Sequence, residues 1–395
     1  MRRLRAPLGA LVAAAALGLG GCGGGSADSG SVTTVPSAGA PQQRSVVVST
    51  TDGSFDPEAV YQEAAPGVVT IRSIFSGGGL PSVFGGGGRS AAQGSGFVIS
   101  DGGEIATNAH VVTDGEGGGG PIHEAKEVYV QFADRNQVAA HIEGFDPNAD
   151  VALLKVDPAG LDLHPLRLAT NEEVKVGQPV AAIGSPFGED RSLSVGVVSA
   201  TDRSIQSLTR FQIEGAIQTD ASINPGNSGG PLLDADANVI GIDQQINTTS
   251  GGNEGVGFAV PITLAARSLD ELRRAGSVEY AYIGVSTQSL YPQLADRLGL
   301  SSDVGALVAR VVPDGPADAA GLQGSDQKIQ FQGQEVSAGG DVIVAVGGDK
   351  IASEADLPRL ISRFDPGETV TLEIIRDGQT QSIDVKLGQR PAAGG

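Results

Sequence analysis

Short apolar runs rich in Val and Ile, separated by Gly, Asp, Asn and Pro, recur from about Asp56 to Pro261. Many short strands at fairly even spacing are typical of a β-sandwich or β-barrel. The strand-like runs are GSGFVIS (94–100), EVYVQF (127–132), VALLKV (151–156), PVAAIG (179–184), SVGVVSA (194–200), NVIGID (238–243) and GVGFAV (255–260). A Gly-rich segment (75–93) interrupts the pattern and is expected to be a surface loop.

A second unit with its own strands follows a predicted helix. The segment PITLAARSLDELRRAG (261–276) has apolar residues at helical spacing and ends in Gly276. Beyond it lie strand-like runs, a hairpin signal at Asp377-Gly378, and two helix-like segments, 316–322 and 354–364. The predicted division of the chain is 1–22 signal peptide, 23–57 flexible low-complexity linker, 58–262 β domain, 263–280 connecting helix, 281–388 α+β module and 389–395 tail.

The N-terminus has the features of a processing signal. A cationic MRRLR precedes an apolar run (6–21) that is shorter than the ~20 residues of a membrane span. Cys22, the single cysteine, follows it, and LGGC resembles the bacterial lipobox. We expect Cys22 to be lipidated and to anchor the chain to a membrane. A plainly cleaved signal and an uncleaved anchor are the alternatives, and all three place the protein outside the cytoplasm.

Charge excludes one class of partner. The formal net charge is −20, so a basic face for nucleic acid is not expected. We interpret the acidity as a contribution to solubility. No His/Cys cluster suggests zinc, and no metal or cofactor is expected.

The stretch INPGNSGGPL (223–232) pins Ser228 between glycines. A serine nucleophile needs a base and N–H donors for the oxyanion that forms. Glycine tolerates positive φ, so the N–H groups of Gly226 and Ser228 can converge on one oxygen. The alternative is an ordinary Gly/Pro turn with an unimportant serine.

The base is expected to be a histidine oriented by a carboxylate. His110, in ATNAHVV, follows a strand and is the candidate. Asp150 directly precedes the strand VALLKV and is the preferred orienting acid, while Asp146 in the turn-like FDPN ranks second. The remaining histidines are interpreted as surface residues: His123, His141 and His164.

TNAHVV, DVALLKV and GNSGGPL, in this order, resemble the triad motifs of the HtrA/Deg family of trypsin-like serine proteases. The resemblance covers about residues 58–388. It implies a chymotrypsin-like double β-barrel. It also implies that Ser228 is the nucleophile, His110 the general acid/base, and Asp150 the group that orients His110. Proteins of this family are typically trimers, and the resemblance alone implies a trimer for this chain.

Two positions depart from digestive trypsins. Asn227 replaces the acid that precedes the nucleophile there, so activation by cleavage of a pro-segment is not expected. Ser222 stands where a trypsin has an acid, which argues against cleavage after Lys or Arg and favours small or medium aliphatic residues. The resemblance implies switching by ordering of loops, here 184–194, 221–227 and 244–255.

The second module resembles an HtrA-type PDZ domain. Such a domain binds an extended peptide by strand addition and caps its C-terminal carboxylate with backbone N–H groups. The matching loop is Tyr282, Ile283, Gly284 and Val285. The extra segment 324–338 predicts a hairpin around Gly333 and leaves the peptide preference open.

Together these features predict an exported serine endopeptidase that cleaves unfolded or damaged envelope proteins. Its PDZ module would bind exposed C-termini. A catalytically weak peptide-binding chaperone or scaffold is the alternative from a different class. A regulatory protease with one substrate would share the chemistry and differ in the breadth of its cleavage sites.

Overall fold

The computed structural model describes the following residues: 55–75, 91–115, 121–185, 191–224, 226–244 and 255–391. The predicted signal peptide, Cys22 and most of the predicted linker lie outside them, as do parts of all three predicted switching loops. Within the described residues, no helix is both long enough and apolar enough to cross a membrane.

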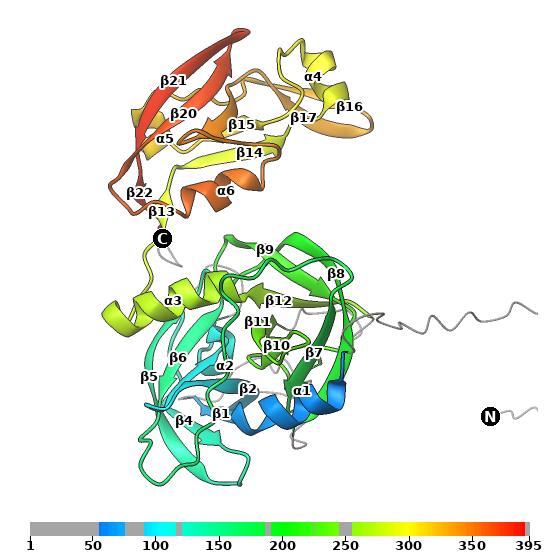
Figure 1. Cartoon of the computed structure of the whole chain (residues 1–395). Helices are drawn as coiled ribbons and strands as arrows, with labels where there is room; N and C mark the ends of the chain where they lie inside the picture. Colours follow the sequence, from blue (N-terminus) through cyan, green and yellow to red (C-terminus); the bar gives the residue numbers. More distant parts are fainter. Residues whose placement is uncertain are drawn as a thin grey trace, which may run out of the picture. The chain divides into compact units, whose positions relative to one another are not determined.

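An N-terminal barrel is formed by antiparallel strands in the closed order β1-β2-β3-β6-β5-β4 (Figure 1). Alternation along each strand sends one set of side chains into the barrel, where Ile71, Val98, Ile105 and Leu154 are fully buried. The strands are β1 (Val68–Ile74), β2 (Ala91–Ser100), β3 (Glu104–Thr107), β4 (Glu127–Gln131), β5 (Gln137–Asp146) and β6 (Val151–Lys155). The last residues of the predicted 75–93 loop therefore belong to β2.

A C-terminal barrel has the closed order β10-β11-β12-β9-β8-β7. The core inside it contains Val180, Ile217, Leu232 and Ile240. The strands are β7 (Pro179–Gly184), β8 (Ser192–Gln206), β9 (Gln212–Thr219), β10 (Pro231–Leu233), β11 (Val239–Gln244) and β12 (Gly257–Pro261). The mostly-β, double-barrel expectation is confirmed.

One apolar cluster lies between the barrels and joins them. Leu153 of β6, Ile183 of β7 and Val260 of β12 are fully buried in this cluster. Leu269 and Leu272 add one face of helix α3 (Ile262–Ala275), which the sequence predicts correctly; residues 277–280 of the predicted connecting segment are not helical. Burial on both faces explains why VALLK reads as a continuous apolar run.

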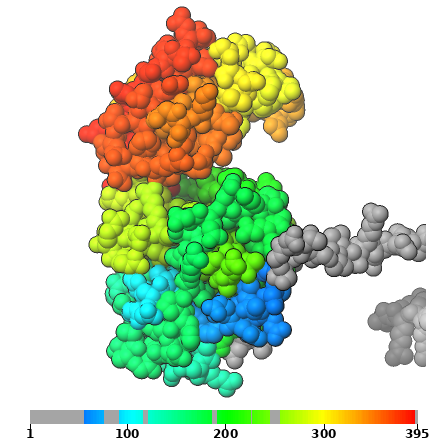
Figure 2. Space-filling view, viewed as in Figure 1, coloured from blue at the N-terminus to red at the C-terminus, as the bar shows by residue number. Residues whose placement is uncertain are grey.

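Helix α1 (Pro57–Ala64) was not predicted, although its start signal is present in the sequence. Asp56 accepts hydrogen bonds from the backbone N–H groups of Glu58 and Ala59, and Pro57 occupies the first turn. The turn η1 (Ala65–Gly67) leads from α1 into β1. In the space-filling view α1, in blue, lies against green segments of the C-terminal barrel (Figure 2), where Tyr61 donates to the carbonyl of Arg191.

The second module is an antiparallel sheet in the order β14-β15-β18-β20-β21, with β19 beside β18. Two two-stranded sheets, β13–β22 and β16–β17, accompany it. The strands of the module are β13 (Ala281–Tyr282), β14 (Val285–Ser289), β15 (Ala306–Val311), β16 (Gln327–Phe331), β17 (Gln334–Ala338), β18 (Val342–Val346), β19 (Asp349–Lys350), β20 (Thr369–Arg376), β21 (Gln379–Lys386) and β22 (Gly388–Gln389). The predicted hairpins form as β16–β17 and β20–β21. Gln389, assigned to the tail, pairs with Ala281.

Three short helices complete this module: α4 (Pro292–Leu298), α5 (Pro316–Ala319) and α6 (Asp356–Ile361). The sequence predicts α5 and α6 within longer segments and does not predict α4. Leu357, Leu360 and Ile361 of α6 pack into the main core of the module, whereas Leu294 and Ala295 of α4 belong to a second cluster with Val336 of the β16–β17 hairpin. The inserted hairpin is therefore packed against the module.

One buried acid in the C-terminal barrel has no hydrogen-bond partner for its carboxylate among the described residues. Asp243, on β11, is fully buried, and neither carboxylate oxygen has a hydrogen-bond partner among the described residues. Burial raises the pKa of Asp243 well above its ordinary value, because nothing in the site compensates the loss of water around the charged form. The folded protein therefore keeps the Asp243 proton to a higher pH than the unfolded chain does.

We predict that Asp243→Asn removes a pH-dependent destabilisation. Between the unfolded pKa of about 3.9 and the raised folded pKa, the native state binds more protons than the unfolded state, so the free energy of unfolding of the wild type falls as pH rises. Each unit of elevation corresponds to about 1.4 kcal/mol. Thermal unfolding should show the Tm difference, variant minus wild type, growing from pH 4.5 to pH 8.

The control is Asp303→Asn, which changes an exposed acid. It measures what the loss of one acid at the surface does to the Tm. Parallel Tm-against-pH curves for Asp243→Asn and the wild type would contradict the prediction.

Candidate active site

His110 and Asp150 are held together by two hydrogen bonds. His110 lies on the short helix α2 (Ala109–Val112), and Asp150 precedes β6. The His110 Nδ1 atom is 2.7 Å from Asp150 Oδ2, and the His110 backbone N–H donates to Asp150 Oδ1 at 2.9 Å. Nδ1–H therefore faces the carboxylate, which leaves Nε2 free to accept a proton from a nucleophile.

Asp150 is anchored by its backbone. The Asn108 side-chain amide donates to the Asp150 carbonyl at 2.8 Å, and Asn108 is also the residue that begins α2. Asp150 is fully buried and has a positive φ of 54°, a conformation that aspartate tolerates better than most residues. The sequence ATNAH thus supplies both the histidine and the amide that fixes its partner.

The surroundings of His110 favour its charged form on balance. Burial is the largest influence and lowers the pKa of His110, because it disfavours the imidazolium. The charge of Asp150 and its hydrogen bond act in the opposite direction and together outweigh burial, so the pKa of His110 is raised. An imidazolium formed during a reaction is therefore stabilised where it forms.

Asp146, the second-ranked candidate for the orienting acid, forms hydrogen bonds with residues other than His110. Its Oδ2 accepts from the hydroxyls of Ser268 and Tyr280, both at 2.6 Å, and its Oδ1 accepts from the N–H of Asn148 and of Ala149. Burial raises the pKa of Asp146, and these hydrogen bonds offset only part of that rise. Its contacts tie β5 to α3 and to the chain after α3, which is a structural role.

Ser228 lies in a tight turn stabilised by backbone hydrogen bonds. Asn227 N–H donates to Asn224 O at 2.9 Å, and Gly230 N–H donates to Asn227 O at 2.8 Å. Gly226 has a φ of 103°, in the region that favours glycine. The predicted glycine-rich turn at this position is confirmed.

Close packing brings this turn beside α2. A Cβ at Gly229 would lie 2.2 Å from Ser95 O and 3.1 Å from Asn108 N. A Cβ at Gly94 would lie 2.7 Å from Val111 Cγ2 and 3.1 Å from Ser228 O. Only glycine fits these approaches, so β2, α2 and the turn of Ser228 meet in one place at the junction of the two barrels.

The other histidines lie apart from this junction. His123 is exposed and pairs with Asp114 at 3.0 Å; His164 is exposed beside Asp162; and His141 is exposed on β5. Their interpretation as surface residues is confirmed. In the described part of the chain, no group of three or more His, Cys, Asp or Glu side chains is arranged to hold a metal ion.

Two features near the turn matter to its chemistry. The Ser222 side chain is exposed, and its carbonyl accepts from the side-chain amide of Asn227. Ser95, which the sequence presents as one residue of a strand, is fully buried and donates its hydroxyl to Gly226 O. The sequence signal for Ser95 was its place between two glycines inside a strand. Glycines in a strand predict that another backbone segment approaches closely, but they do not predict which segment it is.

Within the Tyr282–Val285 segment, Ile283 and Gly284 connect the end of β13 to the start of β14. Gly284 has a φ of 80°, its carbonyl accepts from Val312 N–H, and the carbonyl of Ile283 accepts from Ala317 N–H. Strand β14 pairs with β15 on one side, and among the described residues no strand pairs with its other edge. A free strand edge next to a glycine loop is what strand addition requires.

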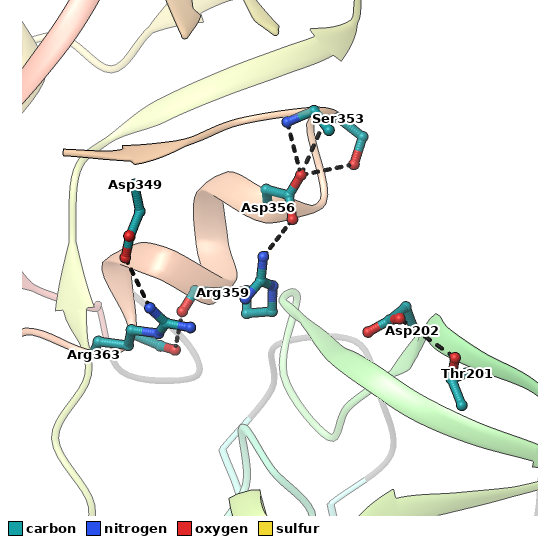
Figure 3. Close-up of polar contacts among 9 residues, drawn as sticks. Thr201, Asp202, Asp349, Ser353, Asp356, Arg359 and Arg363 are labelled. Atoms are coloured by element: carbon teal, nitrogen blue, oxygen red, sulfur yellow. Dashed lines mark hydrogen bonds and ion pairs between the residues drawn. The ribbon is translucent and has the colours of Figure 1, made fainter. Parts of the chain in front are cut away.

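The residues before α6 and the insertion both contact β14: Glu354 N–H donates to Ser289 Oγ of β14 at 3.4 Å. Asp356 accepts from the N–H groups of Ala352 and Ser353 and pairs with Arg359, which fixes the start of α6 (Figure 3). Ser337 of the inserted hairpin donates its N–H to Gln288 of β14 at 3.0 Å. The insertion therefore contacts the strand that would carry a peptide.

Comparison with known families and proteins matches both parts of the chain. A trypsin-like peptidase domain matches residues 94–242, and a PDZ domain matches residues 281–387. The structure is similar to the HtrA-type protease AlgW with a tripeptide, with a TM-score of 0.69 and 31% identity, over 86% of this chain and 99% of that one.

Curated relatives agree. A protein of Pseudomonas putida (strain W619) named "Probable periplasmic serine endoprotease DegP-like" is 43% identical over 75% of this chain and 56% of its own length. One of the same name from Ectopseudomonas mendocina (strain ymp) is 39% identical over 86% of this chain and 72% of its own length. The chain spans little more than half the length of the Pseudomonas putida protein. On these matches, the chain belongs to the HtrA/DegP-like family of trypsin-like serine endoproteases that carry a PDZ domain.

Proposed function

We propose that this chain is an exported serine endopeptidase that hydrolyses peptide bonds in unfolded or damaged envelope proteins. The observation that carries the proposal is the pair of His110 and Asp150, 2.7 Å apart, beside the glycine turn of Ser228. Relatives named periplasmic serine endoproteases support both the reaction and a site of action outside the cytoplasm.

In the proposed mechanism His110 Nε2 takes the proton of the Ser228 hydroxyl as the oxygen attacks the scissile carbonyl. Asp150 keeps the imidazole in the tautomer that leaves Nε2 unprotonated and stabilises the imidazolium that follows. The imidazolium then donates its proton to the leaving amine. Water, activated by His110, hydrolyses the acyl-enzyme and regenerates Ser228.

The oxyanion is assigned to the N–H groups of Gly226 and Ser228. Backbone donors in a water-poor site stabilise charge that develops only in the transition state. Gly226 and Ser228 are both buried, so a carbonyl oxygen seated there would be shielded from solvent. The exposed Ser222 and the absence of an acid at that position support cleavage after small or medium aliphatic residues.

The PDZ module is assigned to recognition of C-terminal peptides. A bound peptide would add to the free edge of β14, and its carboxylate would lie at the Tyr282–Val285 loop. Contact between β14 and the inserted hairpin supports a peptide preference specific to this chain. Lipidation of Cys22, switching by the three predicted loops and assembly into trimers are part of the proposal.

We predict that Ser228→Ala reduces degradation of unfolded casein by about 10⁴-fold or more, because removing one triad member leaves only residual catalysis. The measurement is release of acid-soluble peptides by the purified protein, with C-terminal peptides added to engage the PDZ module. Equal activity of variant and wild type would refute the role of Ser228. A wild type that binds casein and never cuts it would favour the chaperone or scaffold alternative.

Asp150→Asn and Asp146→Asn form a matched pair of buried acids. Asp150→Asn should lower kcat on the order of 10⁴-fold with a small change in Tm, because the amide favours the wrong tautomer of His110. Asp146→Asn should retain kcat and lower the Tm, because the acceptor of Ser268 and Tyr280 loses its charge. A larger loss of kcat in Asp146→Asn, measured where both proteins are folded, would reverse the assignment.

A matched pair of glycines tests the peptide site. Gly284 and Gly299 both have positive φ, 80° and 67°, and both lie in the PDZ module. Gly284→Ala should weaken binding of C-terminal peptides about tenfold or more by straining the proposed carboxylate loop, whereas Gly299→Ala should leave Kd unchanged. Fluorescence anisotropy with a peptide panel, each as free acid and as C-terminal amide, measures this. Equal Kd values for acid and amide would exclude carboxylate capture.

A further inference from the structure

The hydroxyl of Ser95 is held in one orientation by two backbone groups. Ser95 is fully buried on β2, its Oγ donates to Gly226 O at 2.6 Å, and it accepts from Ser185 N–H at 3.0 Å. A serine hydroxyl has a single proton to donate. Because the Ser185 amide can only donate, the hydroxyl proton is directed at Gly226.

These contacts fix the central peptide of the Ser228 turn at both ends. The peptide between Gly226 and Asn227 has its C=O bonded to Ser95 Oγ and its N–H bonded to Asn224 O at 2.9 Å. It lies between the N–H of Gly226 and the N–H of Ser228, the two proposed oxyanion donors. These bonds therefore fix the backbone between the two donors, and with it the direction of one donor relative to the other.

The backbone of Ser95 is bound to the same turn. Ser95 N–H donates to Ser228 O at 2.8 Å, and Ser95 O accepts from the Thr107 hydroxyl at 2.6 Å. Close packing of Gly184 against Asn227 limits sideways movement of the turn, since a Cβ at Gly184 would lie 2.6 Å from Asn227 Oδ1. What remains free is rotation about the Gly226 backbone, which glycine allows at low cost. The Ser95 hydroxyl opposes that rotation.

We propose that Ser95 is a positioning residue that orients the oxyanion donors through the Gly226 carbonyl. This inference rests on the proposed function of Gly226 and Ser228. It predicts a loss confined to the transition state, because the oxyanion forms only there.

The test is Ser95→Ala in the full-length protein, assayed on a fluorogenic peptide taken from a mapped casein cleavage site. At a temperature below the Tm of all variants, kcat should fall about 10- to 100-fold, while KM changes less than about threefold. This fall in kcat is no larger than the fall caused by removing one oxyanion donor outright. A peptide boronate that mimics the tetrahedral intermediate should bind more weakly by the same factor as kcat/KM. Ser95→Thr, which keeps the hydroxyl, should recover most of the rate.

Ser73→Ala is the matched control. Ser73 is also a fully buried serine in the N-terminal barrel, and its hydroxyl has no hydrogen-bond partner among the described residues. Its kcat should stay within about twofold of the wild type. This control measures what the loss of a buried hydroxyl does without the Gly226 contact.

The role of Ser95 and the proposed function can fail independently in these experiments. If Ser228→Ala abolishes activity and Ser95→Ala keeps wild-type kcat, the inference on Ser95 is wrong and the proposed function stands. A Ser95→Ala variant with a lower Tm and unchanged boronate affinity also overturns it, since that pattern indicates a structural role alone. If Ser228→Ala remains active, the proposed function fails first.

Discussion

The carboxylate of Asp150 holds His110 by both its ring and its backbone N–H, and the rest of the site is arranged around this pair. These two hydrogen bonds come from a buried acid with a positive φ, whose backbone carbonyl accepts from the side-chain amide of Asn108. Asp150 is fully buried at the junction of the two closed barrels, where water is excluded. The barrels therefore supply the environment, and the short helix α2 between β3 and β4 places His110 against Asp150.

Beside the apolar cluster that joins the barrels, the part of the junction at the Ser228 turn is closely packed through glycines. Glycines at 94, 184, 229 and 230 let β2, β7 and the Ser228 turn approach so closely that a Cβ at any of them would lie within 3 Å of a neighbouring atom. Hydrogen bonds from Ser95 and to Asp243 O then fix the orientation of the turn. Rigid donors of this type need little reorganisation when charge develops on a substrate oxygen.

Not every buried carboxyl in this region serves the chemistry. Asp146 joins β5 to α3 and Tyr280, and Asp243 lies beside the turn with no partner for its oxygens among the described residues. Both carboxyls have raised pKa values because of burial, whereas the site described here is defined by the partners of Asp150. Geometry, and not burial, distinguishes Asp150, which contacts His110, from Asp146 and Asp243.

The sequence by itself determined helix α3, the two hairpins of the second module and seven of the twelve described barrel strands; it did not single out β1, β3, β5, β9 and β10. Period-two patterns, capping residues and glycine turns are local signals, and the three motifs carry a family resemblance. Helices α1, α2 and α4 were not predicted, because each is short and receives its stability from packing. Only the tertiary structure decided that Ser95 contacts Gly226 and that Asp146 binds Ser268 and Tyr280. These contacts join residues more than 25 positions apart, through barrel closure that no local pattern encodes.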